Sequence, residues 1–88
     1  MVNKSIVIKN KTGLHLRPAG VLSKAATACS SEVTIIKADG TKVNPKSVLH
    51  LMGAGIMFGD EIVLQCEGET EQEDLDTLAK LIEDGLGE

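Results

Sequence analysis

Hydrophobic residues follow two different periods along this chain of 88 residues, one of two residues and one of about 3.6. Strict alternation predicts four strands, which we place at 2–9, 33–37, 42–43 and 61–67. Helical spacing predicts three helices, at about 16–28, about 45–53 and about 71–84. The predicted order of elements is therefore βαββαβα.

The last helix has the clearest pattern. Its apolar positions recur at i, i+3, i+4 and i+7, in the stripe Leu75, Leu78, Ala79 and Ile82. Thr70 and Glu73 have the spacing of a capping box at its beginning. Helices with one apolar stripe and strands with one apolar face predict an α+β sandwich, in which helices cover one face of an antiparallel sheet. The length suits a single domain over residues 1–88.

One candidate site lies where the first strand gives way to the first helix. His15 stands at the beginning of this helix, and the backbone N–H groups of Leu16 and Arg17 have no partner in the first turn. Pro18 has no N–H to leave unpaired. The free N–H groups, the helix dipole and the guanidinium attract an anion and disfavour a cationic imidazole, so the ring suits nucleophilic attack on a phosphoryl group. A histidine at this position is more often a cap or a surface residue, and the residues alone leave that alternative open.

A second candidate site opens the short helix. Asn44 is expected to cap it, Pro45 to occupy its first position and Ser47 to lie in its first turn. A phosphate on Ser47 would be stabilised by the helix end, although an exposed serine near a helix N-terminus is common without any such role. Core packing is the default expectation for the apolar residues of this region, especially Val48 and Phe58. The alternative is that Val48, Leu49, Met52 and Phe58 leave an exposed apolar patch near His15.

Composition excludes several classes of function. The net charge of −4, the lack of a Lys/Arg-rich run and a single aromatic residue, Phe58, argue against nucleic-acid binding. No apolar run approaches the roughly 20 residues that span a bilayer. Cys29 and Cys66 are expected as small buried hydrophobes, His50 as a surface residue, and no cluster has the spacing of metal ligands.

Two segments resemble the HPr family of bacterial phosphocarrier proteins. Residues 13–19 (GLHLRPA) are similar to its active-site segment, with Leu16 where the family usually has Ala. Residues 43–48 (VNPKSV) are similar to its regulatory serine segment, with Pro45 in place of a usual Leu. The later segments 51–53 and 59–62 also follow the family in order and spacing. The resemblance implies an open-faced β-sandwich, a four-stranded antiparallel sheet covered on one face by three helices.

The resemblance also implies a function. His15 would accept a phosphoryl group from enzyme I, with Arg17 beside it and the phosphate held by Leu16, Arg17 and Pro18, and would pass the group to sugar-specific IIA components. Such a protein is a covalent carrier in a relay and not an enzyme. Ser47 would be the target of an HPr kinase/phosphorylase and would engage a catabolite-control transcription factor. The docking surface would comprise Leu16, Val48, Leu49 and Met52.

We expect a cytoplasmic protein, because the first residues are strand-like and polar and not a signal peptide, and no apolar run could span a bilayer. We also expect a monomer without a cofactor. Two other functions stay open. The first is a relay that serves nitrogen regulation or dihydroxyacetone phosphorylation in place of sugar uptake. The second is a purely regulatory binding module that uses Ser47, although family members of that kind lack the active histidine and this chain has His15.

Overall fold

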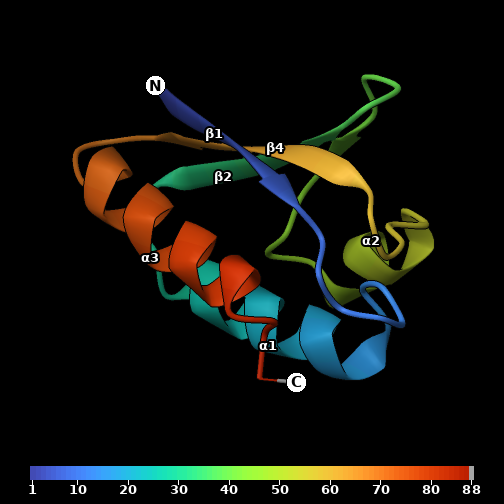
Figure 1. Ribbon diagram of the computed structural model, residues 1–88. Helices are drawn as coiled ribbons and strands as arrows, with labels where there is room; N and C mark the ends of the chain where they lie inside the picture. The colour runs from blue at the N-terminus through green and yellow to red at the C-terminus, as the bar shows by residue number, and fades with distance from the viewer. Residues whose placement is uncertain (88) are drawn as a thin grey trace.

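The computed structural model describes residues 1–87, and within them the order of elements is βαββαβα (Figure 1). The strands are β1 (Val2–Val7), β2 (Glu32–Lys37), β3 (Lys42–Val43) and β4 (Glu61–Glu67). The helices are α1 (Leu16–Thr27), α2 (Val48–Gly53) and α3 (Glu71–Glu83). The predicted fold class and element order are confirmed. The largest difference in bounds is at α2, which begins about three residues later than expected.

The sheet is antiparallel throughout, in the order β1-β4-β2-β3. β4 lies between β1 and β2, and its Ile62 pairs with Ile6 on one side while its Leu64 pairs with Ile35 on the other. β3 lies at one edge and pairs only with Ile35 and Ile36 of β2. The hairpin predicted between β2 and β3 is confirmed.

The helices lie on one side of the sheet in Figure 1, with α1 and α3 next to each other and α2 beside the first half of α1. α3 packs against β1 and β4, and α1 packs against both other helices. The predicted covering of a single sheet face is therefore confirmed. Within residues 1–87, no helix has the combination of length and hydropathy needed to cross a membrane.

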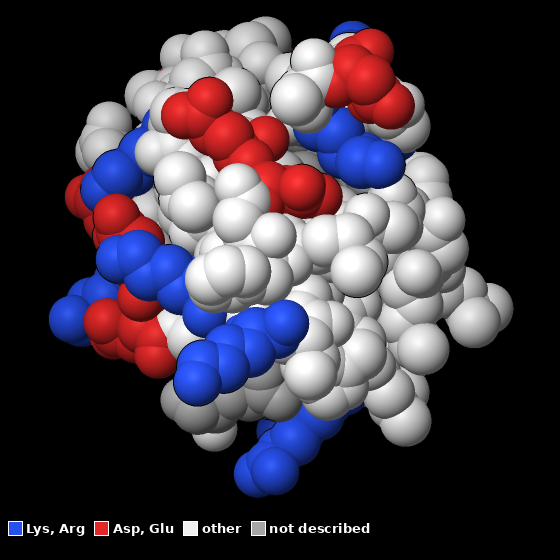
Figure 2. Space-filling model, turned by 45° about the vertical axis from the view of Figure 1, so that its right-hand side comes forward, with Lys and Arg blue, Asp and Glu red and all other residues white. Residues whose placement is uncertain are grey.

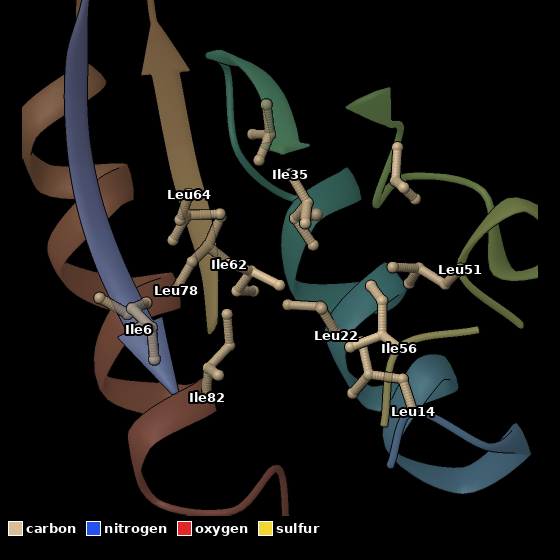
Figure 3. Close-up of a cluster of buried hydrophobic side chains, with 14 of the residues drawn as sticks. Ile6, Leu14, Leu22, Ile35, Leu51, Ile56, Ile62, Leu64, Leu78 and Ile82 are labelled. Carbon is tan, nitrogen blue, oxygen red and sulfur yellow. The ribbon is translucent and has the colours of Figure 1, made fainter. Parts of the chain in front are cut away.

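The core between sheet and helices is made of aliphatic side chains (Figure 3). Residues that are fully buried or nearly so come from both layers, and they include Ile6, Ile35, Ile62, Leu64, Leu22, Leu78 and Ile82. Burial of one such side chain stabilises the fold by about 1.5–3 kcal/mol. The expectation that Phe58 packs in the core is wrong, because the loop after α2 turns Ile56 inward and leaves Phe58 60% exposed.

The beginning of α3 differs from the predicted capping box. Thr70 is the N-cap residue, but its side chain makes no cap hydrogen bond. Its hydroxyl donates instead to Asp74 Oδ2 at 2.8 Å, and Glu71 Oε1 accepts from the Gly68 N–H at 3.2 Å. The same Asp74 oxygen accepts from the backbone N–H of Ser31 at 3.1 Å, which ties the beginning of α3 to the loop before β2. The tertiary hydrogen bond between Ser31 and Asp74 thus fixes the beginning of α3, where we expected the local hydrogen bonds of a capping box.

Candidate functional site

The turn between β1 and α1 fixes the position of His15. Gly13 has a φ of +70°, and a Cβ at this residue would lie 2.5 Å from the carbonyl oxygen of Ile56. Leu14 is buried and donates its backbone N–H to the same oxygen at 3.0 Å. His15 follows directly and is exposed. The close contact of Gly13 with the Ile56 carbonyl, which only glycine allows, therefore lies two residues before His15.

His15 is the N-cap residue of α1. Its backbone is extended, with φ −82° and ψ −169°, and its carbonyl accepts the N–H of Ala19 at 2.9 Å. Leu16, Arg17 and Pro18 occupy the first three helical positions, where backbone N–H groups have no acceptor inside the helix. Because Pro18 has no N–H, two backbone donors remain beside the histidine.

The beginning of α1 suits an anion. The first turn holds no acidic residue, and the exposed side chain of Arg17 adds a positive charge to that of the helix dipole. An anion bound to the amides of Leu16 and Arg17 would lie next to the imidazole of His15. The buried ring of Pro18 anchors this turn to the body of the protein. The structure thus brings the four predicted residues of this site together.

Ser47 is the N-cap residue of α2, and its Oγ accepts the backbone N–H of His50 at 3.2 Å. It does not lie in the first turn, as we expected. Asn44 does not cap the helix either, because its Oδ1 accepts the N–H of Lys46 at 3.0 Å and closes a turn before the helix begins. Pro45 lies in this turn and is buried, so its predicted place at the first helical position is wrong.

The segment before Ser47 is attached to α1 and to the loop that follows it. The backbone carbonyl of Lys46 accepts the hydroxyl of Ser23 at 3.1 Å, and the Lys46 ammonium donates to the carbonyl of Ser31 at 2.9 Å. Ser23 is buried within α1. The two contacts give Ser47 a defined position relative to the helix that begins beside His15.

Exposed apolar side chains occupy α2, the first residue of α1 and the loop after α2. We call them the apolar patch, and they are Leu16, Leu49, Met52, Met57 and Phe58, exposed by 65%, 83%, 42%, 59% and 60%. Figure 2 shows a broad uncharged surface on the side of the molecule that carries α2, with charged side chains around it.

Two members of the apolar patch were not predicted as docking residues. Met57 and Phe58 lie in a loop between Gly55 and Gly59. Two adjacent apolar residues in such a loop could have indicated that their side chains are exposed. Val48, which we did predict as a docking residue, is half-buried and packs against the core.

The remaining candidate residues form no second reactive centre. His50 is exposed, as expected, and its Nδ1 accepts the N–H of Asn44 at 3.1 Å. Burial raises the pKa of the Cys66 thiol to about 11 and also raises the pKa of Cys29, which is only half-buried. Both thiols are therefore protonated at neutral pH. No group of three potential metal ligands occurs among residues 1–87.

Comparisons with known proteins agree on one family. A family model described as the PTS HPr component phosphorylation site matches residues 2–84. The phosphocarrier protein HPr of Streptomyces coelicolor is 43% identical over 88 residues, which are 100% of this chain and 95% of that protein. The HPr-like protein Crh of Halalkalibacterium halodurans is 45% identical over 94% of this chain and 98% of its own. The crystal structure of HPr-C-His from Thermoanaerobacter tengcongensis has a TM-score of 0.93 at 42% identity, with 100% of this chain and 98% of the other covered.

Proposed function

This chain belongs to the HPr family, which comprises non-catalytic phosphocarriers and related regulatory proteins, and we propose that it carries the phosphoryl group on His15. One observation carries the proposal. His15 is the exposed N-cap residue of α1, and the two backbone donors that follow it belong to Leu16 and Arg17. The parts needed to accept and hold a phosphoryl group therefore follow one another in the chain.

Transfer to His15 needs no proton to leave the ring. In the neutral imidazole one nitrogen carries the proton, and the other attacks phosphorus. The family's acceptor nitrogen is Nδ1, so the proton stays on Nε2 while the new N–P bond forms and the bond to the donor breaks. We propose enzyme I as the donor and a sugar-specific IIA component as the acceptor. In the second transfer the N–P bond breaks, and the phosphoryl group moves to the IIA component.

The phosphate would be held by two backbone amides and one side chain. Hydrogen bonds to a charged group contribute about 1.5–3 kcal/mol each, so every further donor would make the phosphohistidine more stable and less ready to react. Pro18 stands where a third donor would otherwise be. The exposed Arg17 guanidinium adds one positive charge beside these amides. This balance suits a carrier, which has to release what it binds.

We propose that the apolar patch and Val48 form the surface that both partners meet, and that Ser47 regulates access to it. A phosphate on Ser47 would add a charge of about −1.5 to −2 at the beginning of α2. The exposed side chains of Leu49 and Met52 lie on the same short helix, and a charge of this size opposes burial of such a surface in an interface. A kinase that modifies Ser47 would thereby slow transfer to His15.

The protein would act in the cytoplasm as a monomer.

The test compares two histidine variants. Phosphorylated enzyme I, labelled in its phosphoryl group, is mixed with the wild type, with His15→Ala and with His50→Ala. Transfer is expected to be lost in His15→Ala and kept in His50→Ala, because His50 is on α2 and accepts the N–H of Asn44. Circular dichroism checks that both variants are folded. Label that persists on His15→Ala would refute the proposal.

A regulatory module without phosphohistidine is the second candidate, because the relative named Crh is as similar to this chain as the relatives named HPr. The two candidates differ in the chemistry of the bound phosphate. Phosphohistidine is lost in acid, whereas phosphoserine survives it. Incubation of the protein in a cell extract, followed by acid treatment, separates them: acid-labile phosphate supports the carrier, and acid-stable phosphate alone supports the regulatory module.

A further inference from the structure

The turn that leads to His15 is held from two sides. On one side, the N–H of Leu14 donates to the carbonyl of Ile56. On the other side, Asn10 lies at the beginning of the turn, and its Nδ2 donates to the backbone carbonyl of Gly85 at 2.6 Å. Gly85 comes directly after the C-cap residue of α3 and is 75 positions away from Asn10. Asn10 therefore connects the turn before His15 to the end of another helix.

Asn10 is a polar residue in a buried position, with only 3% of its surface exposed. Its backbone carbonyl accepts the N–H of Gly13 at 3.0 Å and closes the turn over residues 10–13. Burial of an amide group is unfavourable unless the group is hydrogen-bonded, so the contact with Gly85 is one that the fold has reason to keep. One residue thus closes the turn with its backbone and anchors it with its side chain.

The group that Asn10 binds is itself fixed by the end of α3. Gly85 has a φ of +89° and donates its N–H to the carbonyl of Ile82 at 3.1 Å. Leu86 follows with a φ of +54°, a left-handed conformation that residues with a side chain disfavour. Leu86 is nevertheless fully buried, and its N–H donates to the carbonyl of Leu81 at 3.0 Å. Burial of this side chain offsets the strain, and the carbonyl of Gly85 is held at a defined position.

The position of the turn matters most for the rate of phosphoryl transfer. Four residues separate Asn10 from His15, so a shift of the turn carries the histidine with it. Attack on phosphorus requires that the reacting atoms are accurately placed, and a misplacement of about 1 Å can lower a rate about 100-fold. Most of the apolar patch lies on α2 and in the loop after it, and these elements do not depend on Asn10. Loss of the anchor should therefore affect transfer much more than docking.

We propose that Asn10 is a positioning residue for phosphoryl transfer. Its hydrogen bond to Gly85 holds the turn before His15 against the end of α3, and the imidazole is thereby kept in place for the incoming phosphorus. Asn10 is too deeply buried to touch the phosphate or a partner protein, so it acts only through the turn. This inference rests on the carrier function proposed for His15.

The experiment measures single-turnover transfer of labelled phosphate from phosphorylated enzyme I to the full chain, over a range of chain concentrations. Asn10→Ala is expected to lower the maximum rate about 10- to 100-fold. The concentration that gives half of the maximum rate should change less than twofold, because docking is unaffected. Urea unfolding followed by circular dichroism identifies a temperature at which the variant is folded. Asn10→Leu, which keeps about the size of the side chain without its donor, should give the same result and replaces Asn10→Ala if that variant does not fold.

Ser31→Ala is the matched control. The buried hydroxyl of Ser31 donates to Asp74 and ties the opposite end of α3 to a loop, so this variant also loses a buried hydrogen bond of α3. Both the maximum rate and the half-saturating concentration should stay as in the wild type. Relaxation of ¹⁵N nuclei is expected to show greater mobility of the amides of residues 11–15 in Asn10→Ala, and not in Ser31→Ala.

The outcomes separate this inference from the carrier proposal. If the wild type takes up no label, the carrier proposal fails and this inference fails with it. If the wild type is labelled and Asn10→Ala reaches the same maximum rate, Asn10 has no positioning role and the carrier proposal stands. The same conclusion follows if Ser31→Ala slows transfer equally, or if the loss in Asn10→Ala appears only in the half-saturating concentration.

Discussion

Replacement of Gly13 by Ala tests whether the close approach beside His15 holds the turn together. Gly13 has a φ of +70°, and the new Cβ would lie 2.5 Å from Ile56 O and 3.0 Å from Met57 Cα. Both neighbours are backbone atoms and cannot rotate away. The left-handed conformation costs roughly 1–2 kcal/mol, and displacement of the Ile56 carbonyl from the Leu14 N–H leaves buried groups unpaired at about 1–3 kcal/mol. The expected loss in the free energy of unfolding is about 2–5 kcal/mol, a large part of the roughly 5–15 kcal/mol typical of a domain.

Gly40 provides the matched control. Its φ is +89°, but a Cβ there would meet nothing within 4 Å. Gly40→Ala is therefore expected to lose only about 1–2 kcal/mol, the cost of the conformation by itself. Urea unfolding followed by circular dichroism measures both variants. If the two losses agree within about 0.5 kcal/mol, the contact with Ile56 does not matter and the reasoning is refuted.

Three further predictions concern single side chains. Ser47→Ala removes the cap of α2 and is expected to lower the free energy of unfolding by about 0.5–2 kcal/mol, measured in urea. Pro18→Ala adds a third backbone donor beside His15. We expect it to slow hydrolysis of the phosphohistidine about tenfold, because one hydrogen bond to a charged group stabilises it by about 1.5–3 kcal/mol. Pro45→Ala is the control, which should leave the hydrolysis rate unchanged. Hydrogen bonds, first that of the Ser31 hydroxyl, lower the pKa of Asp74. A lowered carboxyl pKa stabilises the fold at pH values above the ordinary carboxyl pKa of about 4, and this stabilisation is lost as the pH falls. In an acid titration, the free energy of unfolding of Asp74→Asn should therefore decline less below about pH 4 than that of the wild type.

The sequence predicts the layers of this fold because its periods are unambiguous. The stripe from Leu75 to Ile82 can be buried only as a helix, and alternation in β4 can be buried only as a strand. The His15 site was also predictable, since its donors are consecutive residues at one helix end and need no distant contact to come together. The hydrogen bond from the Leu14 N–H to the Ile56 carbonyl could not be predicted, because the two residues are 42 positions apart in the chain.

The hydrogen bonds of two helix caps, at α2 and α3, were predicted incorrectly for a common reason. Each helix beginning contains more than one oxygen that can accept a backbone N–H, and local spacing does not decide between them. At α2 the choice between Asn44 and Ser47 follows from the burial of Pro45, which leaves Asn44 outside the helix. At α3 the hydroxyl of Thr70 is drawn to Asp74, which long-range contacts already hold. Tertiary packing thus selects among caps that are nearly equal in sequence.

The beginning of α1, which we propose as the carrier site, is built from ordinary helix chemistry. Serine or aspartate at the N-cap would stabilise the helix by about 0.5–2 kcal/mol relative to a residue without a cap hydrogen bond, and it would also occupy the amides that a phosphate needs. His15 makes no cap hydrogen bond through its side chain, so the amides of Leu16 and Arg17 are not taken up by the protein's own cap. Pro18 then limits their number to two. In the proposed carrier site, the same residues that leave the helix end less stable would let it accept a phosphate and release it.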